Sequence, residues 1–351
     1  MVTTPGVMPA IFAPTLIVSA GRMDRRIVFL LLTAVLLVAN IVSAFSTNLA
    51  VMLVGRALLG AAFGGFWTLA TAAAPRLVQP KDAARATAII LAGVTCATVI
   101  GVPLGTFIAS FASWRMSFTA TAGLVAIALL TQAMLVPSLP SASALRVSDF
   151  MSLLRRPHAR LSLLMVAFVF GAHFSTYTYI APLLEHDFSL SAITLLLFGF
   201  GLIGFFSNAL MSMVVADHLK KSVAFMILLL LVAISSMLLL QHSTIGETAG
   251  MLLWGVAFGA MPLCFSVWIQ RGTADLPKAG SAMFVSIIQV AIAAGSAAGG
   301  AIVDRAGVHA DFALGLGLAM LGLVMLQRLV ALETNRWRAV AFKQACDASA
   351  E

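Results

Sequence analysis

Residues 222–241 read SVAFMILLLLVAISSMLLLQ and directly follow the charged stretch Asp217-His218-Leu219-Lys220-Lys221. A helix rises about 1.5 Å per residue, so about twenty apolar residues cross the roughly 30 Å hydrocarbon core of a bilayer. The sequence holds ten further runs of similar length. The eleven predicted spans are 2–20, 27–47, 49–73, 84–108, 116–136, 161–183, 190–214, 222–241, 248–270, 280–303 and 311–331. This pattern predicts an all-α polytopic membrane protein.

The composition of the 351 residues agrees with this class. Hydrophobic residues make up 61% of the chain and charged residues 10%, whereas soluble domains hold about 45–50% and about 25%. The net charge of +8 does not indicate nucleic-acid binding, because the basic residues lie between apolar runs rather than on one face with aromatic residues. Cys96, Cys264 and Cys346 lack metal-ligand spacing, so we expect no metal site, no disulfide and no cofactor.

The charges between the spans predict orientation and domain organisation. All of the 21 Lys and Arg residues except Arg56, Arg115 and Arg305 lie in one alternate set of loops or near the C-terminus. Short cytoplasmic loops hold the excess of basic residues, so this side is predicted to be cytoplasmic. The longest connection, 137–160, lies on it. The prediction is an N-terminal helical bundle (1–136), a central cytoplasmic loop (137–160), a C-terminal six-helix bundle (161–331) and a cytoplasmic tail (332–351).

The loop after the first span reads Gly21-Arg22-Met23-Asp24-Arg25-Arg26. An Asp at a helix end, paired with Arg and with a neighbouring helix terminus, can hold one conformation on the cytoplasmic side. We therefore take Asp24 and Arg25 as candidate transport residues. The alternative is a basic loop that only sets topology.

Arg56 lies inside the third span, in Gly55-Arg56-Ala57-Leu58-Leu59-Gly60. An Arg at the centre of a membrane helix costs about 2.5–3.5 kcal/mol on insertion scales, so Arg56 and Gly60 are candidate transport residues. Arg56 lies only about 10 Å from the outer end of the span. The alternative is therefore a side chain that extends to the outer surface.

The fourth span contains Gly101-Val102-Pro103-Leu104-Gly105. Proline removes one backbone hydrogen bond, and the flanking glycines let a partner helix approach, so this stretch predicts a bendable helix contact. Ordinary packing of small residues is the alternative, because Gly60/Gly64 and Gly255/Gly259 have the same spacing.

Residues 171–182, GAHFSTYTYIAP, form the richest polar and aromatic stretch in any predicted span. A flat solute that forms hydrogen bonds needs rings to stack on and donors to orient it. His173 and Tyr177 are therefore the leading candidates for a substrate cavity, with Gln289, Asn208 and Trp254 as weaker ones. The alternatives are hydrogen bonds between helices and an interfacial aromatic belt.

Together these motifs resemble the major facilitator superfamily. The first loop is similar to the Gly-x-x-x-Asp-Arg-x-Gly-Arg-Arg loop of that family, although Ala20 replaces the first Gly and the remainder is compressed. Arg56 with Gly60 resembles the motif of the fourth family helix, and 101–105 resembles the antiporter motif, although Val102 separates its Gly-Pro pair. Further matches at 64–67, 114–118 and 268–281 resemble the drug:proton antiporter branch, which contains arabinose-efflux-like proteins and purine ribonucleoside exporters.

The resemblance implies a secondary active transporter that exports small solutes across the bacterial inner membrane. It implies proton antiport with alternating access, a lipid-embedded monomer, and purine ribonucleosides or sugars as leading substrates. Multidrug efflux is an alternative. An enzyme is not expected, because we expect no carboxylate within the spans and Gly-x-Ser-x-Gly is absent. A channel would show repeated pore-lining segments rather than two bundles suited to alternating access.

The two halves are unequal in the number of predicted spans. Five precede 137–160 and six follow it, and the Asp24 loop corresponds to the Asp217 loop after the seventh span. The sixth span then has no counterpart, so we expect an additional helix of about twenty residues before Met1. Related efflux proteins carry an acidic residue in that helix. We therefore expect a fragment or a mis-started reading, and a transport-incompetent fragment is a further alternative.

Overall fold

The computed structural model describes residues 23–348 except for 74–76, 98–100, 102–103, 106–107, 109–111, 141–146 and 242. Every regular element in this part of the chain is a helix, which confirms the predicted all-α class. The N-terminal half holds α2 (Arg25–Ala44), α3 (Leu49–Ala73), the short η2 (Pro80–Asp82), α4 (Ala83–Cys96) and α6 (Trp114–Leu135). The C-terminal half holds α7 (Val147–Arg155), α8 (Pro157–Thr178), α9 (Ile180–Leu184), α10 (Leu190–Val214), α11 (Leu219–Leu239), α12 (Thr244–Gly272), α13 (Pro277–Ala306) and α14 (Val308–Ala348).

Within the described residues, 9 helices are long and apolar enough to cross a membrane: α2, α3, α6, α8 and α10 to α14. They coincide with nine of the eleven predicted spans. Of the other two, 2–20 lies outside the described residues, and 84–108 is described as the shorter apolar helix α4 with isolated residues after it.

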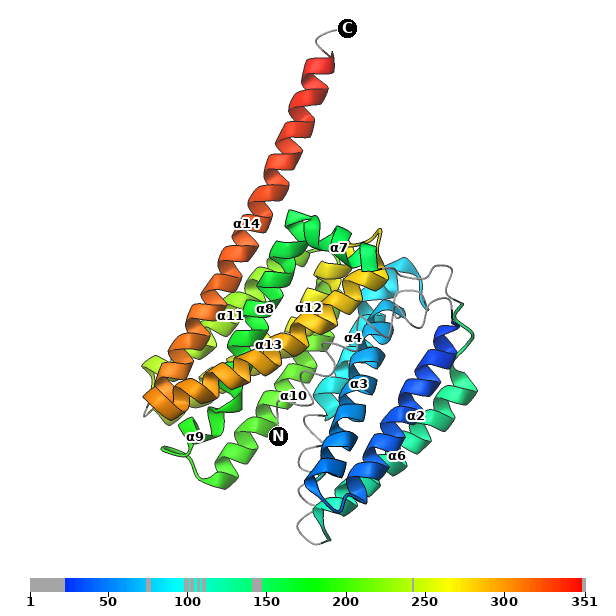
Figure 1. The fold of residues 1–351 in the computed structure, drawn as a ribbon. Helices are drawn as coiled ribbons and strands as arrows, with labels where there is room; N and C mark the ends of the chain where they lie inside the picture. Colours follow the sequence, from blue (N-terminus) through cyan, green and yellow to red (C-terminus); the bar gives the residue numbers. More distant parts are fainter. Residues whose placement is uncertain are drawn as a thin grey trace.

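The helices form two groups, with α2, α3 and α6 in one and α8 to α14 in the other (Figure 1). In the first group α2 packs against both α3 and α6. In the second, α11 packs in the same way against α12 and α14. Since α2 follows the Asp24 loop and α11 follows the Asp217 loop, the repeated packing matches the correspondence inferred between these two sequence stretches.

Glycine pairs let α10 and α12 approach very closely. A methyl group added at Gly255 would lie 2.6 Å from the carbonyl oxygen of Phe200, and one added at Gly259 would overlap the backbone of Gly204. Such contact increases the dispersion energy between helices that lipid would otherwise separate. The resulting contact holds the middle of α12, which carries Pro262, against α10.

The two groups meet through α4, which packs on α10 and α12, and through α13, which packs on α3. Near the start of α13 they share an inter-bundle cluster of buried apolar residues. Its members come from α2, α3, α7 and α13 and are Val28, Phe29, Leu32, Leu69, Ala70, Leu153, Ala279 and Ala282. All the helix ends at this cluster belong to the predicted cytoplasmic side.

Several helices differ in extent from the predicted spans and connections. The connection 137–160 contains α7 and the first turn of α8, because Pro157 at the first helical position fixes a helix start there. The span 161–183 is interrupted at Tyr179, between α8 and α9. α14 continues through Ala348 into the predicted tail, and Figure 1 shows it extending past the other helices.

The expectation that the spans hold no carboxylate is wrong. Glu247 lies in the first turn of α12, with only 1% of its surface exposed. Asp311 lies in the first turn of α14 and is fully buried. Asp311 is the first residue of its predicted span, and Glu247 directly precedes the span 248–270. Each helix starts three or four residues earlier than its span.

Candidate solute-binding site

An aromatic cluster lies between α8, α10 and α12. His173 and Tyr177 are four residues apart on α8, and Trp254 and Phe258 are four apart on α12, so each pair occupies one face of its helix. Phe200 of α10 completes the cluster. His173 and Trp254 have no exposed surface, and Phe200 is 3% exposed.

One hydrogen bond fixes the protonation of the His173 ring. The indole N–H of Trp254 donates to Nδ1 of His173 at 3.0 Å. Because an indole nitrogen is only a donor, Nδ1 must accept, and the ring proton is on Nε2. Nε2 is buried and has no hydrogen-bond partner in the described part of the structure. The cluster thus contains an unused N–H donor of known position.

Stacked rings surround this donor. The His173 ring lies 3.6 Å from the Phe258 ring at an interplanar angle of 7°, and 5.0 Å from the Tyr177 ring at 18°. Tyr177 in turn stacks on Phe200 at 4.9 Å. Parallel rings of this kind have the geometry that a flat heteroaromatic ring requires, and Nε2 supplies a donor for one of its nitrogen atoms.

The remaining cavity candidates lie apart from the cluster. The side-chain amide of Asn208 in α10 donates to the carbonyl oxygen of Ala88 in α4 at 2.9 Å, so it links the two bundles. Gln289 of α13 is 8% exposed, and no hydrogen bond or ring contact joins it to His173 or Trp254 in the described residues. The structure therefore brings together three of the five predicted cavity residues: His173, Tyr177 and Trp254.

The predicted transport residue Asp24 is the N-cap of α2. Its Oδ1 accepts from the backbone N–H of Arg26 at 2.9 Å and of Leu139 at 2.8 Å, while the hydroxyl of Ser138 donates to Oδ2. The hydroxyl of Ser138, followed by the two backbone donors, lowers the pKa of this carboxyl below its ordinary value. The backbone N–H of Arg25 donates to the carbonyl of Leu139 at 3.1 Å. These contacts fasten the start of α2 to the chain that follows α6.

The other predicted transport residues have separate environments. The guanidinium of Arg56 in α3 lies over the Phe118 ring of α6, 5.2 Å from its centroid, and the side chain is half-buried. Gly60 is buried one turn further along α3. Of the antiporter-like stretch, Pro103 lies outside the described residues and Gly101 is exposed. The carbonyl of Gly105 accepts from Ser117 Oγ at 2.9 Å.

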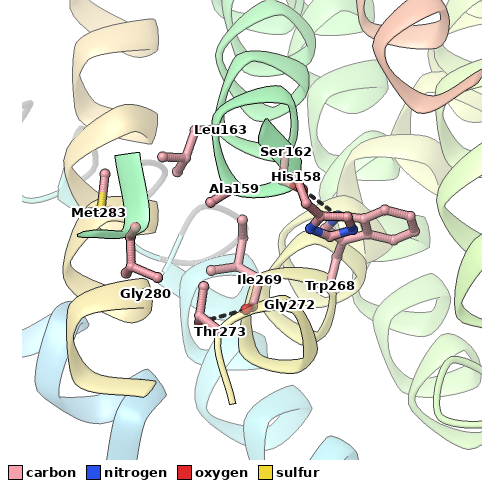
Figure 2. A pocket seen from close by; sticks show the side chains of 11 residues that line it. His158, Ala159, Ser162, Leu163, Trp268, Ile269, Gly272, Thr273, Gly280 and Met283 are labelled. Atoms are coloured by element: carbon pink, nitrogen blue, oxygen red, sulfur yellow. Dashed lines mark hydrogen bonds between the residues drawn. The ribbon is translucent and has the colours of Figure 1, made fainter. Parts of the chain in front are cut away.

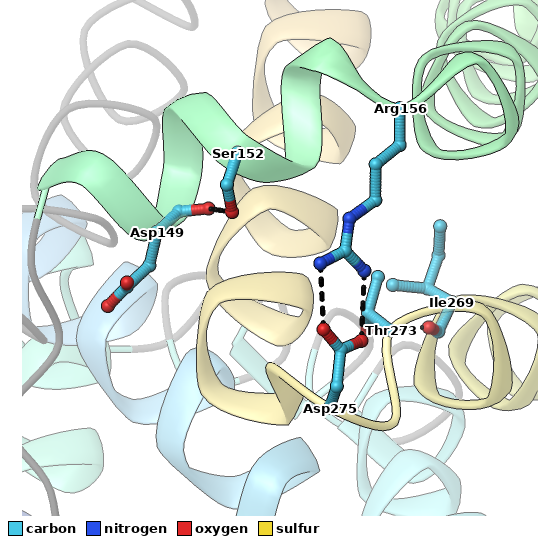
Figure 3. Close-up of polar contacts among 6 residues, drawn as sticks. All are labelled: Asp149, Ser152, Arg156, Ile269, Thr273 and Asp275. Atoms are coloured by element: carbon cyan, nitrogen blue, oxygen red, sulfur yellow. Dashed lines mark hydrogen bonds and ion pairs between the residues drawn. The ribbon is translucent and has the colours of Figure 1, made fainter.

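A second polar region lies at the predicted cytoplasmic end of α8 and α12. The His158 and Trp268 rings are stacked with their centroids 6.1 Å apart (Figure 2), and they lie beside a cavity of about 10 Å³. The Trp268 indole donates to Ser162 Oγ at 2.9 Å. Arg156 forms a two-pronged ion pair with Asp275 at 2.9 and 2.7 Å (Figure 3). This pairing lowers the pKa of Asp275 and raises that of Arg156. The contacts close the connection between α12 and α13 against the start of α8.

Phe200, Phe258 and Asp311 were not among the predicted site residues. The two phenylalanines lie in apolar runs and give no signal that separates them from lipid-facing residues. Asp311 is visible in the sequence, but the predicted span begins at that residue, so it reads as a helix end rather than a buried group.

Comparison with known proteins agrees with this architecture. The family model of the Major Facilitator Superfamily matches residues 1–287. The purine ribonucleoside efflux pump NepI of Salmonella typhimurium (strain LT2) is 30% identical over 300 residues, which cover 85% of this chain and 76% of that protein. NepI of Escherichia coli (strain K12) is 29% identical over 314 residues, covering 89% of this chain and 79% of that protein.

Among solved structures, the human organic anion transporter MFSD10 (TETRAN) has a similar fold. Its TM-score is 0.78 at 21% sequence identity, and the match covers 92% of this chain and 82% of that one. The expected resemblance is thus confirmed by a family model, by relatives that are efflux pumps and by the fold. The chain belongs to the major facilitator superfamily and is a multi-pass membrane transporter of that family.

Proposed function

We propose that this transporter exports purine ribonucleosides across the bacterial inner membrane by proton antiport, and that the aromatic cluster around His173 binds the purine ring. The observation that carries the proposal is the buried Nε2–H of His173, which lies among parallel rings and has no partner among the described residues.

The chemistry of a purine suits this cluster. A purine is flat and carries several ring nitrogens that accept hydrogen bonds. It can stack on Tyr177, whose ring is offset from that of His173, while accepting from His173 Nε2. A sugar has no aromatic face, and a cationic drug would need a negative charge near the rings. The two similar efflux pumps described above are named as purine ribonucleoside exporters.

The contacts between the bundles are consistent with alternating access. The inter-bundle cluster and the bond from Asn208 to Ala88 both lie toward the predicted cytoplasmic side. The bundles are therefore closed against each other on that side, as expected when a solute leaves toward the outside. The transporter acts as a monomer in this mechanism, because each chain has both bundles.

The test is counterflow in proteoliposomes that contain the purified chain. Vesicles preloaded with unlabelled inosine should take up labelled inosine, whereas preloading with arabinose or ethidium should give no such exchange. An imposed pH gradient should then drive net inosine movement against the proton flux. Exchange of arabinose or ethidium without inosine exchange would refute the nucleoside assignment, and inosine movement that ignores the gradient would refute antiport.

A further inference from the structure

The side chain of Asp311 is the most unusual polar group in the C-terminal bundle. It has no exposed surface, and neither Oδ1 nor Oδ2 has a hydrogen-bond partner in the described part of the structure. A buried carboxylate that is ionised must be paired or hydrogen-bonded, because it otherwise loses the solvation that water supplied. Ionisable groups inside membrane helices are therefore strong candidates for function.

The surroundings of Asp311 are backbone groups and small residues. A methyl group added at Gly299 of α13 would lie 2.7 Å from Asp311 Oδ1 and 3.0 Å from the carbonyl oxygen of Ser175 in α8. The glycine thus leaves the space that the carboxyl group occupies. Asp311 Oδ1 and the carbonyl oxygen of Ser175 in α8 therefore both lie close to Gly299 of α13. A negative charge on Asp311 would repel the Ser175 carbonyl, and a proton would remove the repulsion.

Charged groups on the neighbouring elements do not neutralise Asp311. No ion pair includes it among the described residues, and α11 has no titratable side chain between Lys221 and its end at Leu239. The start of α14 favours an anion, but it does not replace the missing hydrogen bonds. Toward this end of the bundle, the titratable groups on the surrounding elements are His173 and Tyr177 in α8, Tyr179 after α8, Glu185, His186 and Asp187 after α9, Glu247 in α12, Asp304 and Arg305 in α13, and His309 in α14. Asp304, Arg305 and His309 are exposed.

We propose that Asp311 is a proton-binding site, protonated in the conformation seen here and deprotonated when α8 moves away from α13 and α14. Asp311 is joined to the aromatic cluster in two ways. Ser175 lies two residues after His173 on α8, and Phe312, the next residue of α14, packs edge-on against Trp254 with centroids 6.1 Å apart. A proton at Asp311 therefore favours the packing that holds His173 and Trp254 together. This link to the solute rests on the proposed function, whereas proton binding itself does not.

Carbodiimide labelling tests the site in the unmodified full chain. Dicyclohexylcarbodiimide is apolar and reacts with protonated carboxyl groups. Trypsin cleaves after Lys278, Arg305 and Arg328, so Asp304 and Asp311 fall on separate peptides, and each is the only acidic residue of its peptide. In proteoliposomes at neutral pH the Asp311 peptide should gain the adduct and the exposed Asp304 should not. Labelling should fall by about tenfold for each pH unit above the titration midpoint. An unlabelled Asp311 peptide, or equal labelling of both, would overturn the proposal.

Infrared spectroscopy gives a second measurement that does not depend on access of the reagent. Asp311→Asn keeps the shape of the neutral acid, so it should fold and should lack a protonated-carboxyl C=O band that the unmodified chain shows at neutral pH. The matched variant Asp304→Asn should keep the band. Because Glu247 is also buried, its carboxyl group can contribute to the same spectral region. A band of unchanged intensity in Asp311→Asn refutes the site. Neither measurement uses a solute. If both support protonated Asp311 but the counterflow assay shows no inosine exchange, the proposed function is refuted and the proton-binding site is not.

Discussion

Trp254 and Trp268 lie on one helix, and each donates a buried hydrogen bond from its indole nitrogen. Trp254 donates to His173, whereas Trp268 donates to Ser162 at the predicted cytoplasmic end. We expect Trp254→Phe to weaken inosine binding by about tenfold, because Nδ1 of His173 loses its donor and the Nε2 tautomer is no longer fixed. A tenfold change equals about 1.4 kcal/mol, within the range for one buried hydrogen bond. Equilibrium binding of labelled inosine measures this loss.

The control is Trp268→Phe, the same substitution on the same helix. It removes one buried indole hydrogen bond as well, so both variants should unfold at a lower temperature than the unmodified chain. Inosine affinity should change only in Trp254→Phe. An equal loss of affinity in the two variants would mean that the effect is one of general stability, and the role of His173 would then be wrong.

Sequence patterns at this scale identify polar residues better than apolar ones. His173, Tyr177 and Trp254 were predicted because polar and large aromatic side chains are conspicuous within apolar spans. Phe200 and Phe258 belong to the same cluster, yet Phe206 and Phe225 in similar runs are exposed by 56% and 55%. Which phenylalanines face the bundle depends on helix rotation, and neither composition nor spacing fixes that rotation.

At the scale of the helices, Gly259 controls how closely α12 approaches α10. A methyl group there would overlap the backbone of Gly204, which a change of rotamer cannot relieve. We expect Gly259→Ala to destabilise the protein by about 1–3 kcal/mol, the usual cost of overpacking. Thermal unfolding in detergent measures the change.

Gly123→Ala in α6 is the matched control for Gly259→Ala. Gly123 is exposed, and an added methyl group would meet no described atom within 4 Å. Alanine in a helix interior is otherwise better than glycine by about 0.5–1 kcal/mol. Gly123→Ala should therefore unfold at the same or a higher temperature. Equal destabilisation by the two substitutions would contradict the close-packing argument.

The helix ends were harder to predict than the helices themselves. Hydropathy located the apolar middle of each span, but α12 and α14 begin three or four residues before their predicted spans. Glu247 therefore fell just outside its span and Asp311 was read as a span end, although both side chains are buried. α7 was missed because its nine residues lie within a connection and are too few to cross a membrane. Its Leu153 is buried in the inter-bundle cluster, a tertiary contact that no local pattern reveals.

At the scale of the whole molecule, contacts across the bundles set the balance between the two access states. The inter-bundle cluster, which includes Leu69, Ala70, Ala279 and Ala282, closes the predicted cytoplasmic side with apolar contacts alone. Such contacts do not require one exact orientation of the two bundles. The bond from Asn208 to Ala88 is directional and buried. Removal of the Asn208 amide deprives the closed state of this hydrogen bond. The open state loses nothing comparable, because there water can bind the amide in place of the Ala88 carbonyl.

Asn208→Ala should therefore shift the chain toward the cytoplasm-open state. A buried hydrogen bond has a net value of about 1 kcal/mol, which changes the ratio of the two states by about fivefold. Spin labels at Arg85 and Lys221, both exposed and on opposite bundles, report this ratio by pulsed electron paramagnetic resonance after replacement of Cys96, Cys264 and Cys346.

The matched control is Ser207→Ala, because the Ser207 hydroxyl donates at 2.7 Å to the carbonyl oxygen of Val256 within the C-terminal bundle. Ser207→Ala should leave the label distances unchanged. If both variants shift them equally, the bond to Ala88 does not hold the bundles closed.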